Sequence, residues 1–193
     1  MDIETLKKLR ECSQASLGEC QKALIEAGND FNKALEILKK KGQLIAEKKK
    51  ERETGAGLIE AYIHSNGRIG ALVELRCETD FVAKNPLFKE LAHDLALQVA
   101  AMAPAYISEL DIPEEVLKEE KEIYREELKT TGKPEKIIEQ IIEGKLKKRF
   151  SEICLLRQPF IKNPDETIES VIKNYIAKLG ENIKVSRFVR FEI

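Results

Sequence analysis

The sequence predicts an α+β protein, in which a bundle of three short helices precedes a core with a small antiparallel sheet, packing helices and a helical hairpin. Apolar residues recur at helical spacing over about the first forty residues. Strict alternation begins after Thr54-Gly55-Ala56-Gly57, and long helical stripes then precede a final alternating segment. We therefore expect a helical partner-binding module with a charged linker in residues 1–54 and an α+β core in residues 55–193, with the hairpin at 113–153.

The charges of the chain are nearly balanced. Lys and Arg number 33 and Asp and Glu number 34, for a net charge of -1. A protein that grips a phosphate backbone needs a basic excess, so we expect no direct nucleic-acid partner. No apolar run is long enough to span a bilayer, and the start, Met1-Asp2-Ile3-Glu4, is acidic, unlike a secretory signal. These features predict a cytoplasmic protein without a membrane partner.

The cysteines are far apart in the sequence, at Cys12, Cys20, Cys77 and Cys154. None forms a Cys-x-x-Cys pair or has a histidine at metal-binding spacing. This usage is typical of a reduced protein in which cysteine is a small apolar residue, and it predicts no metal site.

Each N-terminal helix has its own boundary signals. The first helix is expected from Asp2 to Cys12. Its apolar face comprises Ile3, Leu6 and Leu9. The second begins with a capping box, Ser16-Leu17-Gly18-Glu19, and stops at Gly28. Its apolar positions are Cys20, Ala23, Leu24 and Ala27.

The third helix is expected to begin at a cap, Asn29 or Asp30, and to end at Gly42. Its buried positions are predicted to be Phe31, Ala34, Leu35 and Leu38. The following run, Lys48-Lys49-Lys50-Glu51-Arg52-Glu53, mixes both signs of charge. Mixed signs favour a solvated helix or linker over a nucleic-acid patch.

Two strands are expected around a turn at Ser65-Asn66-Gly67. One apolar row comprises Ile59, Ala61 and Ile63, and the other comprises Ile69, Ala71, Val73, Leu75 and Cys77. A two-residue loop would pair Ser65 with Arg68 and place the rows on opposite faces. A three-residue loop pairs His64 with Arg68 and aligns Ile63 with Ile69. Burial of one common face leads us to predict the three-residue loop.

The later helices carry clear caps and stops. Asn85 and Pro86 open a helix whose apolar stripe is Leu87, Phe88, Leu91, Ala92, Leu95, Ala96, Val99 and Ala103. A helix from Pro113 and another ending near Ile153 are separated by a break at Gly132-Lys133-Pro134, which predicts a projecting antiparallel hairpin. A last helix is expected from Pro164 to Leu179, with Gly180 as its stop. The final strand is predicted to place Ile183, Val185, Val189, Phe191 and Ile193 on one face and Phe188 on the other.

An acid and a large aromatic, Asp80 and Phe81, are adjacent at the junction between the second strand and the helix that Asn85 opens. Such a pair suits presentation to a partner. The alternative is that Phe81 lies in the core and Asp80 is a local cap. Position in the sequence leaves both interpretations open.

The motifs of nucleotide-binding proteins and of hydrolases are missing from the sequence. It has neither a G-x-x-x-x-G-K-[ST] loop nor a G-x-G-x-x-G run, so no bound nucleotide cofactor is expected. The histidines, His64 and His93, have no neighbour at nucleophile or metal spacing. We expect a protein that is not an enzyme.

The segment around this junction resembles the signature of the elongation factor Ts family. It reads Glu74-Leu75-Arg76-Cys77-Glu78-Thr79-Asp80-Phe81-Val82-Ala83-Lys84. The run Cys20-Gln21-Lys22-Ala23-Leu24-Ile25-Glu26-Ala27 is similar to the second N-terminal helix of the family. Segments at 132–135, 158–162 and 187–192 follow in the expected order. The resemblance covers essentially the whole chain.

The resemblance implies a guanine-nucleotide exchange factor that binds elongation factor Tu carrying GDP and speeds GDP release. It implies that Asp80 and Phe81 wedge into the partner's G domain near its magnesium site. Thr79, Val82, Ala83 and Lys84 would complete that contact. It also implies an N-terminal ubiquitin-associated-type domain, and a homodimer because the chain has room for one core repeat.

The N-terminal module is expected to make a second contact with the partner. Leu9, Cys12 and Leu17 are candidates for its docking face, and the alternative is that they close the three-helix core. The chain departs from the family at Ser13-Gln14-Ala15-Ser16, where a Thr-Gly-x-Gly turn is usual, and at Glu19, where Asp is usual. These departures bear on the contacts of this module.

Two other classes of function stay open at this point. An adaptor would use the helical bundle to bind a partner, with the remainder of the chain as scaffold. An RNA-binding translation protein would use the clustered basic positions, which are Lys145, Lys147, Lys148 and Arg149.

Overall fold

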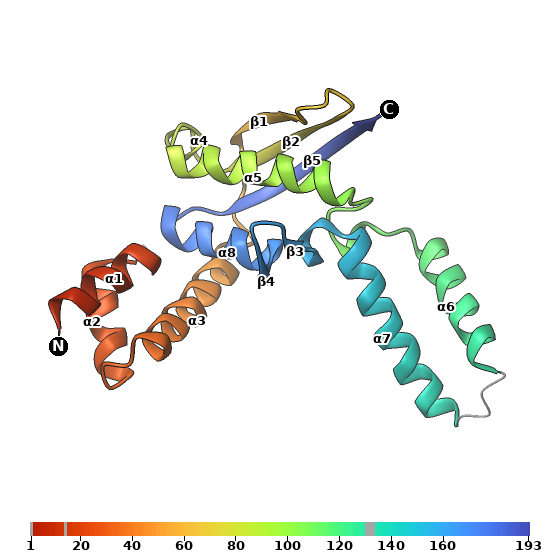
Figure 1. The fold of residues 1–193 in the computed structure, drawn as a ribbon, viewed down its shortest axis with the longest axis horizontal. Coiled ribbons are helices and arrows are strands. Elements are labelled where there is room, and N and C mark those ends of the chain that lie inside the picture. Colours follow the sequence, from red (N-terminus) through yellow and green to blue (C-terminus); the bar gives the residue numbers. More distant parts are fainter. Residues whose placement is uncertain (1, 14, 130–133) are drawn as a thin grey trace.

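The computed structural model describes residues 2–13, 15–129 and 134–193. It has a central body with two projections at opposite ends (Figure 1). The body contains a small antiparallel sheet and its packing helices, the N-terminal helices form one projection, and a helical hairpin forms the other. The predicted α+β class is confirmed. Across the described ranges, no helix has both the length and the apolar character needed to cross a membrane.

The N-terminal module consists of α1 (Ile3–Ser13), α2 (Leu17–Glu26) and the first half of α3 (Phe31–Lys49). The predicted capping box is present, because the Ser16 backbone N–H donates to Glu19 Oε2 at 3.1 Å while Ser16 Oγ accepts from the Glu19 N–H. Asp30 caps α3. The buried core of the module comprises Leu6, Leu9, Cys20, Ala23, Leu24, Ala34 and Leu38. The prediction that Ile3 shares this face was wrong, since its side chain is 70% exposed.

Helix α3 does not end at Gly42, as predicted, but continues to Lys49. Gly42 lies where α3 packs against α8 (Ile168–Leu179), and a Cβ on it would lie 3.2 Å from Ala177 Cβ. The glycine therefore serves a close approach of two helices and not a helix stop. Ala46, one turn further, is buried in the main core, so α3 connects the N-terminal module to the body.

The sheet has the order β1-β2-β5, and both of its pairings are antiparallel. Its strands are β1 (Ala56–Ile63), β2 (Ile69–Cys77) and β5 (Ile183–Glu192). Helix α5 (Pro86–Met102) lies across one face, which we call the inner face (Figure 1). Asn85 caps this helix as predicted, accepting from the Leu87 N–H at 2.9 Å.

The predicted loop register between β1 and β2 was wrong by one residue. Ile63 pairs with Gly70, and the same register places Ser65 opposite Arg68, which is the alternative that we rejected. Ile59, Ala61 and Ile63 are consequently exposed on the outer face. The inner row of β1 includes Leu58 and Tyr62, which pack on the core, and its Glu60 contacts His93 of α5 at 3.1 Å. The inner row of β2 is as predicted.

Strand β5 changes face part-way along its length. The pairing shifts between Glu74 and Leu75, which leaves Ser186 as an extra residue. Ile183 and Val185 precede this bulge and pack on the core, as does Phe188 beyond it. Val189 and Phe191 are exposed instead. The predicted single face from Ile183 to Ile193 was therefore wrong, since the bulge inverts the alternation.

The predicted hairpin is formed by α6 (Glu114–Lys129) and α7 (Glu135–Ile153), which pack through Leu128, Ile142 and Leu146. The predicted break falls partly on Gly132 and Lys133, which lie outside the described residues. The remaining elements are α4 (Asp80–Ala83), η1 (Glu109–Asp111), η2 (Leu155–Arg157), β3 (Pro159–Phe160) and β4 (Asn163–Thr167).

The last helix begins later than predicted. Residues 163–167 form β4, paired with β3, and α8 starts at Ile168. The side chain of Thr167 caps this start by accepting from the Ser170 N–H at 3.2 Å. The predicted stop at Gly180 is confirmed by its left-handed φ of 76°.

Candidate partner-binding site at the Asp80–Phe81 tip

A short helix, α4, projects the aromatic side chain of Phe81 into solvent at the end of β2. We call residues 79–84 the tip. Thr79 is the N-cap of α4, because its Oγ1 accepts from the Val82 N–H. The Phe81 side chain is 89% exposed, and Asp80 beside it is also exposed. Of the two open interpretations, the structure therefore supports the presented pair and not a core phenylalanine capped by Asp80.

The base of the tip is fixed to the core. Ala83 is buried, and Val82 is half-buried against the same cluster that lies under the sheet. Lys84 is exposed at the end of α4. Burial of one side of so short a helix holds the other side outward. The predicted set thus divides into exposed residues (Thr79, Asp80, Phe81 and Lys84) and residues of the base (Val82 and Ala83).

The thiol of Cys77 lies directly under the tip. Its Sγ donates to the Thr79 carbonyl oxygen at 3.2 Å. Burial raises the pKa of this thiol to about 11, and the negative charge of Glu181 adds to the shift. The group is therefore a neutral thiol near pH 7 and packs as an apolar residue, not as a nucleophile.

Two residues that the sequence analysis missed hold the tip from the start of β5. The Glu181 carboxylate accepts from the Thr79 N–H at 2.9 Å and from its hydroxyl at 2.7 Å. The Asn182 N–H donates to Glu78 Oε1 at 2.7 Å. Glu181 is 102 positions from Thr79 in the chain, and no local pattern links residues so far apart.

The candidate docking residues of the N-terminal module have different environments. Leu9 is fully buried in the core of the module, whereas Cys12 and Leu17 are exposed. Leu9 therefore closes the three-helix core, and the surface that remains available includes Cys12 and Leu17. Ile25 on α2 is a further exposed apolar residue that the sequence analysis did not single out.

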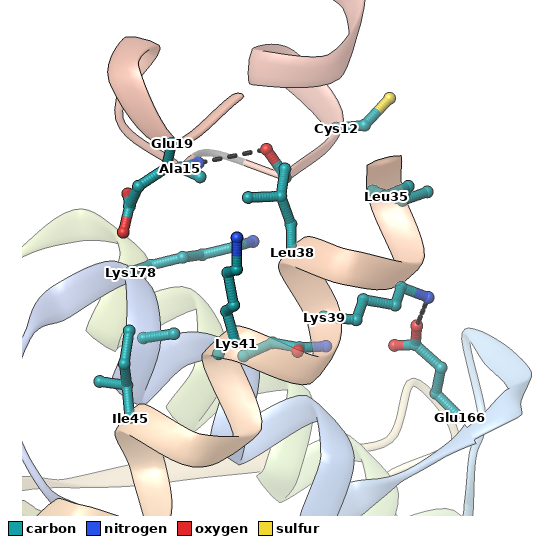
Figure 2. A pocket seen from close by; sticks show the side chains of 14 residues that line it. Cys12, Ala15, Glu19, Leu35, Leu38, Lys39, Lys41, Ile45, Glu166 and Lys178 are labelled. Carbon is teal, nitrogen blue, oxygen red and sulfur yellow. Dashed lines mark hydrogen bonds and ion pairs between the residues drawn. The ribbon is translucent and has the colours of Figure 1, made fainter. Parts of the chain in front are cut away.

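A cavity of about 290 Å³ separates the N-terminal module from α8 (Figure 2). Lys41 and Lys178 line it, Cys12 lies at its edge, and Lys39 forms an ion pair with Glu166 across its rim. Partial burial lowers the pKa of the Lys178 ammonium. Charged side chains of both signs surround the cavity, so the interface between the N-terminal module and the body is polar here.

Two of the clustered basic side chains of the hairpin form ion pairs with carboxylates. Lys145 contacts Glu127 at 2.5 Å, and Arg149 contacts Glu120 at 2.9 Å. Within the part of the chain that the structure describes, no group of three or more His, Cys, Asp or Glu side chains is placed to hold a metal ion. The tip thus presents an aromatic ring and a carboxylate to solvent.

Comparison with known proteins identifies the family. The family model described as Elongation factor TS matches residues 4–193. The chain belongs to the elongation factor Ts family. It is 54% identical to the elongation factor Ts of Thermosipho melanesiensis, over 100% of this chain and 98% of that relative. It is 53% identical to that of Thermotoga petrophila, over 100% of this chain and 96% of the relative.

A further elongation factor Ts, from Carboxydothermus hydrogenoformans, is 50% identical over 98% of this chain and 88% of its own length. The resemblance seen at the signature segment is therefore confirmed along the whole chain. The tip, the sheet and the hairpin all lie inside the range that the elongation factor Ts family model covers.

Proposed function

We propose that this chain is a guanine-nucleotide exchange factor that binds elongation factor Tu carrying GDP and promotes GDP release during translation elongation in the cytoplasm. It acts by binding alone and carries out no covalent catalysis. The observation that carries the proposal is the exposed Phe81 beside Asp80 on a short helix whose base is buried. Membership of the elongation factor Ts family supports the choice of partner.

The physical requirement is differential binding. Exchange is accelerated only if the tip binds the nucleotide-poor partner more tightly than the GDP-bound partner. The coupling is reciprocal: GDP lowers the affinity of elongation factor Tu for this protein by the same factor as this protein lowers its affinity for GDP. A rigid tip suits this role, because little conformational freedom is lost when it binds.

In the proposed complex, the ring of Phe81 fills an apolar pocket of the partner's G domain near the magnesium site. Asp80 hydrogen-bonds beside it, and together they disturb the contacts of the magnesium ion and the phosphates. Lys84 and Thr79 extend the contact surface at the two ends of α4. A buried aromatic anchor at such an interface is worth about 2–4 kcal/mol on truncation.

The N-terminal module supplies a second contact with elongation factor Tu in this proposal. We take it to be a ubiquitin-associated-type domain, and its exposed Cys12 and Leu17 to belong to the docking face. Leu9 supports this surface from within the core.

We also propose that the chain forms a homodimer through the outer face of the sheet. Exposed apolar side chains from all of its strands gather there: Ile59, Ile63, Leu72, Val189 and Phe191. The charges on the same face are paired with one another, since Arg76 and Arg187 both contact Glu74 and lower the pKa of its carboxyl. A mainly apolar face whose few charged side chains bond to one another suits a second copy of itself better than a strongly charged partner.

Phe81→Ala tests the exchange proposal. Release of fluorescent GDP from a bacterial elongation factor Tu, followed by stopped flow, should be accelerated by the wild-type chain. Loss of the aromatic anchor should slow the stimulated release about ten-fold or more. The thermal unfolding midpoint should stay unchanged, because the ring is 89% exposed in the free protein.

Leu110→Ala is the matched control. Leu110 is 95% exposed and lies in η1, near the base of the hairpin and not at the tip. Its truncation should leave GDP release unchanged. Full exchange activity in a folded Phe81→Ala variant contradicts the wedge. No acceleration by the wild type, with a competent partner, contradicts the exchange function and favours the adaptor.

A further inference from the structure

The tip is connected to the C-terminal end of α3, the helix that carries the N-terminal module, by a network of hydrogen bonds that runs through Gly180, Glu181 and Asn182. We call these three residues the anchor loop. They follow α8 and lead into β5. On one side Glu181 holds Thr79 through both carboxylate oxygens, at 2.9 and 2.7 Å. The N-cap of α4 is thereby fixed from outside its own helix.

On its other side the anchor loop contacts the end of α3. The Asn182 side-chain amide donates to the carbonyl oxygens of Lys50 and Arg52, at 3.1 and 2.8 Å. Lys49, the last residue of α3, donates from its ammonium to the Gly180 carbonyl. Asn182 is 2% exposed, so the two bonds of its side-chain amide are partly shielded from water, whereas the Lys49 bond is exposed.

A second connection passes through Glu78, the residue before Thr79. Its Oε1 accepts from the Asn182 N–H at 2.7 Å, and its Oε2 lies 3.5 Å from Arg52. Consecutive residues of the tip segment, Glu78 and Thr79, are therefore bonded to consecutive residues of the anchor loop. Two adjacent attachments fix both the position and the direction of the chain that enters α4.

We propose that Glu181 is a positioning residue for the Asp80–Phe81 tip, and that the anchor loop ties the tip to the helix that carries the N-terminal module. The proposal rests on the exchange function proposed above. Glu181 acts through its bonds to Thr79 and need not touch the partner. Its carboxylate keeps α4 in the orientation that presents Phe81. Little conformational entropy is therefore lost when the tip binds the partner.

The expected kinetic signature follows from preorganisation. Without the carboxylate, the Thr79 N–H and hydroxyl lose acceptors, and α4 samples orientations other than the presented one. Apparent affinity falls in proportion to the population of the competent orientation. For Glu181→Ala, the half-saturating concentration in the exchange assay should rise about ten-fold, while the release rate at saturation should change less than two-fold or so. If Glu181 instead contacted the partner only while GDP is being released, Glu181→Ala would lower the release rate at saturation and not raise the half-saturating concentration.

The motion of the tip is measurable in the free protein. The sequence contains no tryptophan, so Phe81→Trp places a single indole on the tip. Adding Glu181→Ala should increase the amplitude of nanosecond depolarisation of this indole about two-fold in time-resolved anisotropy. Glu181→Gln keeps one acceptor oxygen and should give an intermediate value.

Glu139→Ala is the matched control for both assays. It removes a carboxylate that pairs with Arg125 on the hairpin, away from the tip. It should leave the anisotropy and the half-saturating concentration unchanged. A double-mutant cycle provides the second control, because Glu181→Ala should add little to the defect of Phe81→Ala if it acts through the ring.

The outcomes separate the two proposals. Unchanged anisotropy in the Glu181→Ala variant, or full additivity with Phe81→Ala, overturns the positioning role even when the wild type is active. An increase in indole motion with no exchange activity in the wild type supports the positioning role and overturns the exchange function. An equal defect in thermal stability and saturating rate, without tip motion, assigns Glu181 a merely structural role.

Discussion

At the scale of single residues, the environment of a phenylalanine decides its role. Phe81 and Phe88 lie close together in the sequence, yet Phe81 is 89% exposed and Phe88 is fully buried under the sheet. The tip is so short that only Ala83 is buried and Val82 half-buried, and the Phe81 ring is left in solvent. Sequence position left the two roles of Phe81 open, because the identity of the residue is the same in either case.

The cysteines differ in the same way, and their reactivity should follow exposure. Cys12 is exposed, whereas Cys20, Cys77 and Cys154 are buried. In the native protein at pH 8, we expect one thiol to react quickly with an aromatic disulfide reagent and the others only after unfolding. Cys12→Ser should abolish the fast phase. Rapid reaction of more than one thiol would contradict the buried environment of the remaining cysteines.

Burial also predicts how stability changes at alkaline pH. Burial raises the pKa of Cys77 and of Cys154 to about 11, from an ordinary value of 9.0. Folding therefore favours the neutral thiol, and this contribution is fully present below pH 9.0 and is lost as the pH rises toward about 11. The urea midpoint should fall over that range, and Cys77→Ala should make the fall shallower.

At the scale of secondary-structure elements, local signals in the sequence predicted the ends of helices better than the faces of strands. The capping box at Ser16, the Asn85 cap and the Gly180 stop are all present, because each depends on residues within a few positions. The faces of β1 and β5 depend on the turn register and on the bulge at Ser186. The two-residue loop at Asn66-Gly67 gives the observed register of β1, and it was rejected only because both apolar rows were assumed to face the core. The bulge at Ser186 has no comparable signal in the local sequence.

Two glycines inside helices predict opposite effects on stability. A side chain at Gly42 would meet Ala177 across the contact of α3 with α8, whereas a Cβ at Gly144 in α7 would have no neighbour within 4 Å outside its own helix backbone. Gly42→Leu should therefore lower the free energy of unfolding by about 1–3 kcal/mol through overpacking. Gly144→Ala should raise it by about 0.5–1 kcal/mol through helix propensity.

Urea unfolding followed by circular dichroism measures both changes. The two variants serve as controls for each other. Both replace a helical glycine by a better helix former, so helix propensity alone would raise the free energy of unfolding in both. Opposite changes therefore identify the contact with Ala177 as the cause of the loss at Gly42. Stabilisation by Gly42→Leu would mean that α3 and α8 do not approach closely at this position.

At the scale of the whole molecule, the surfaces proposed for binding lie on separate parts of the fold. The tip and the N-terminal module lie toward the same end of the body, and the hairpin projects from the other end (Figure 1). The anchor loop joins the tip to the C-terminal end of α3, the helix that carries the module. The outer face of the sheet lies opposite α5, and neither the tip nor the N-terminal module covers it. The chain therefore has room to bind elongation factor Tu and a second copy of itself at once.

The sequence predicted the tip but not the outer face of the sheet, because the apolar rows that form this face were assigned to the core.

The homodimer is tested on that face with Phe191→Asp. Phe191 is 66% exposed and pairs with Gly70, over which the side chain of Ile63 lies, so the ring continues an apolar surface across the sheet. The wild-type chain should have twice the monomer mass of 22.0 kDa in light scattering after size-exclusion chromatography. Phe191→Asp should be monomeric and folded, because a carboxylate buried in a desolvated interface is left unpaired. Leu110→Asp, which alters an equally exposed apolar residue elsewhere, should remain dimeric. A monomeric wild type, or a dimeric Phe191→Asp variant, would remove the outer face as the dimer contact and leave it available to another protein.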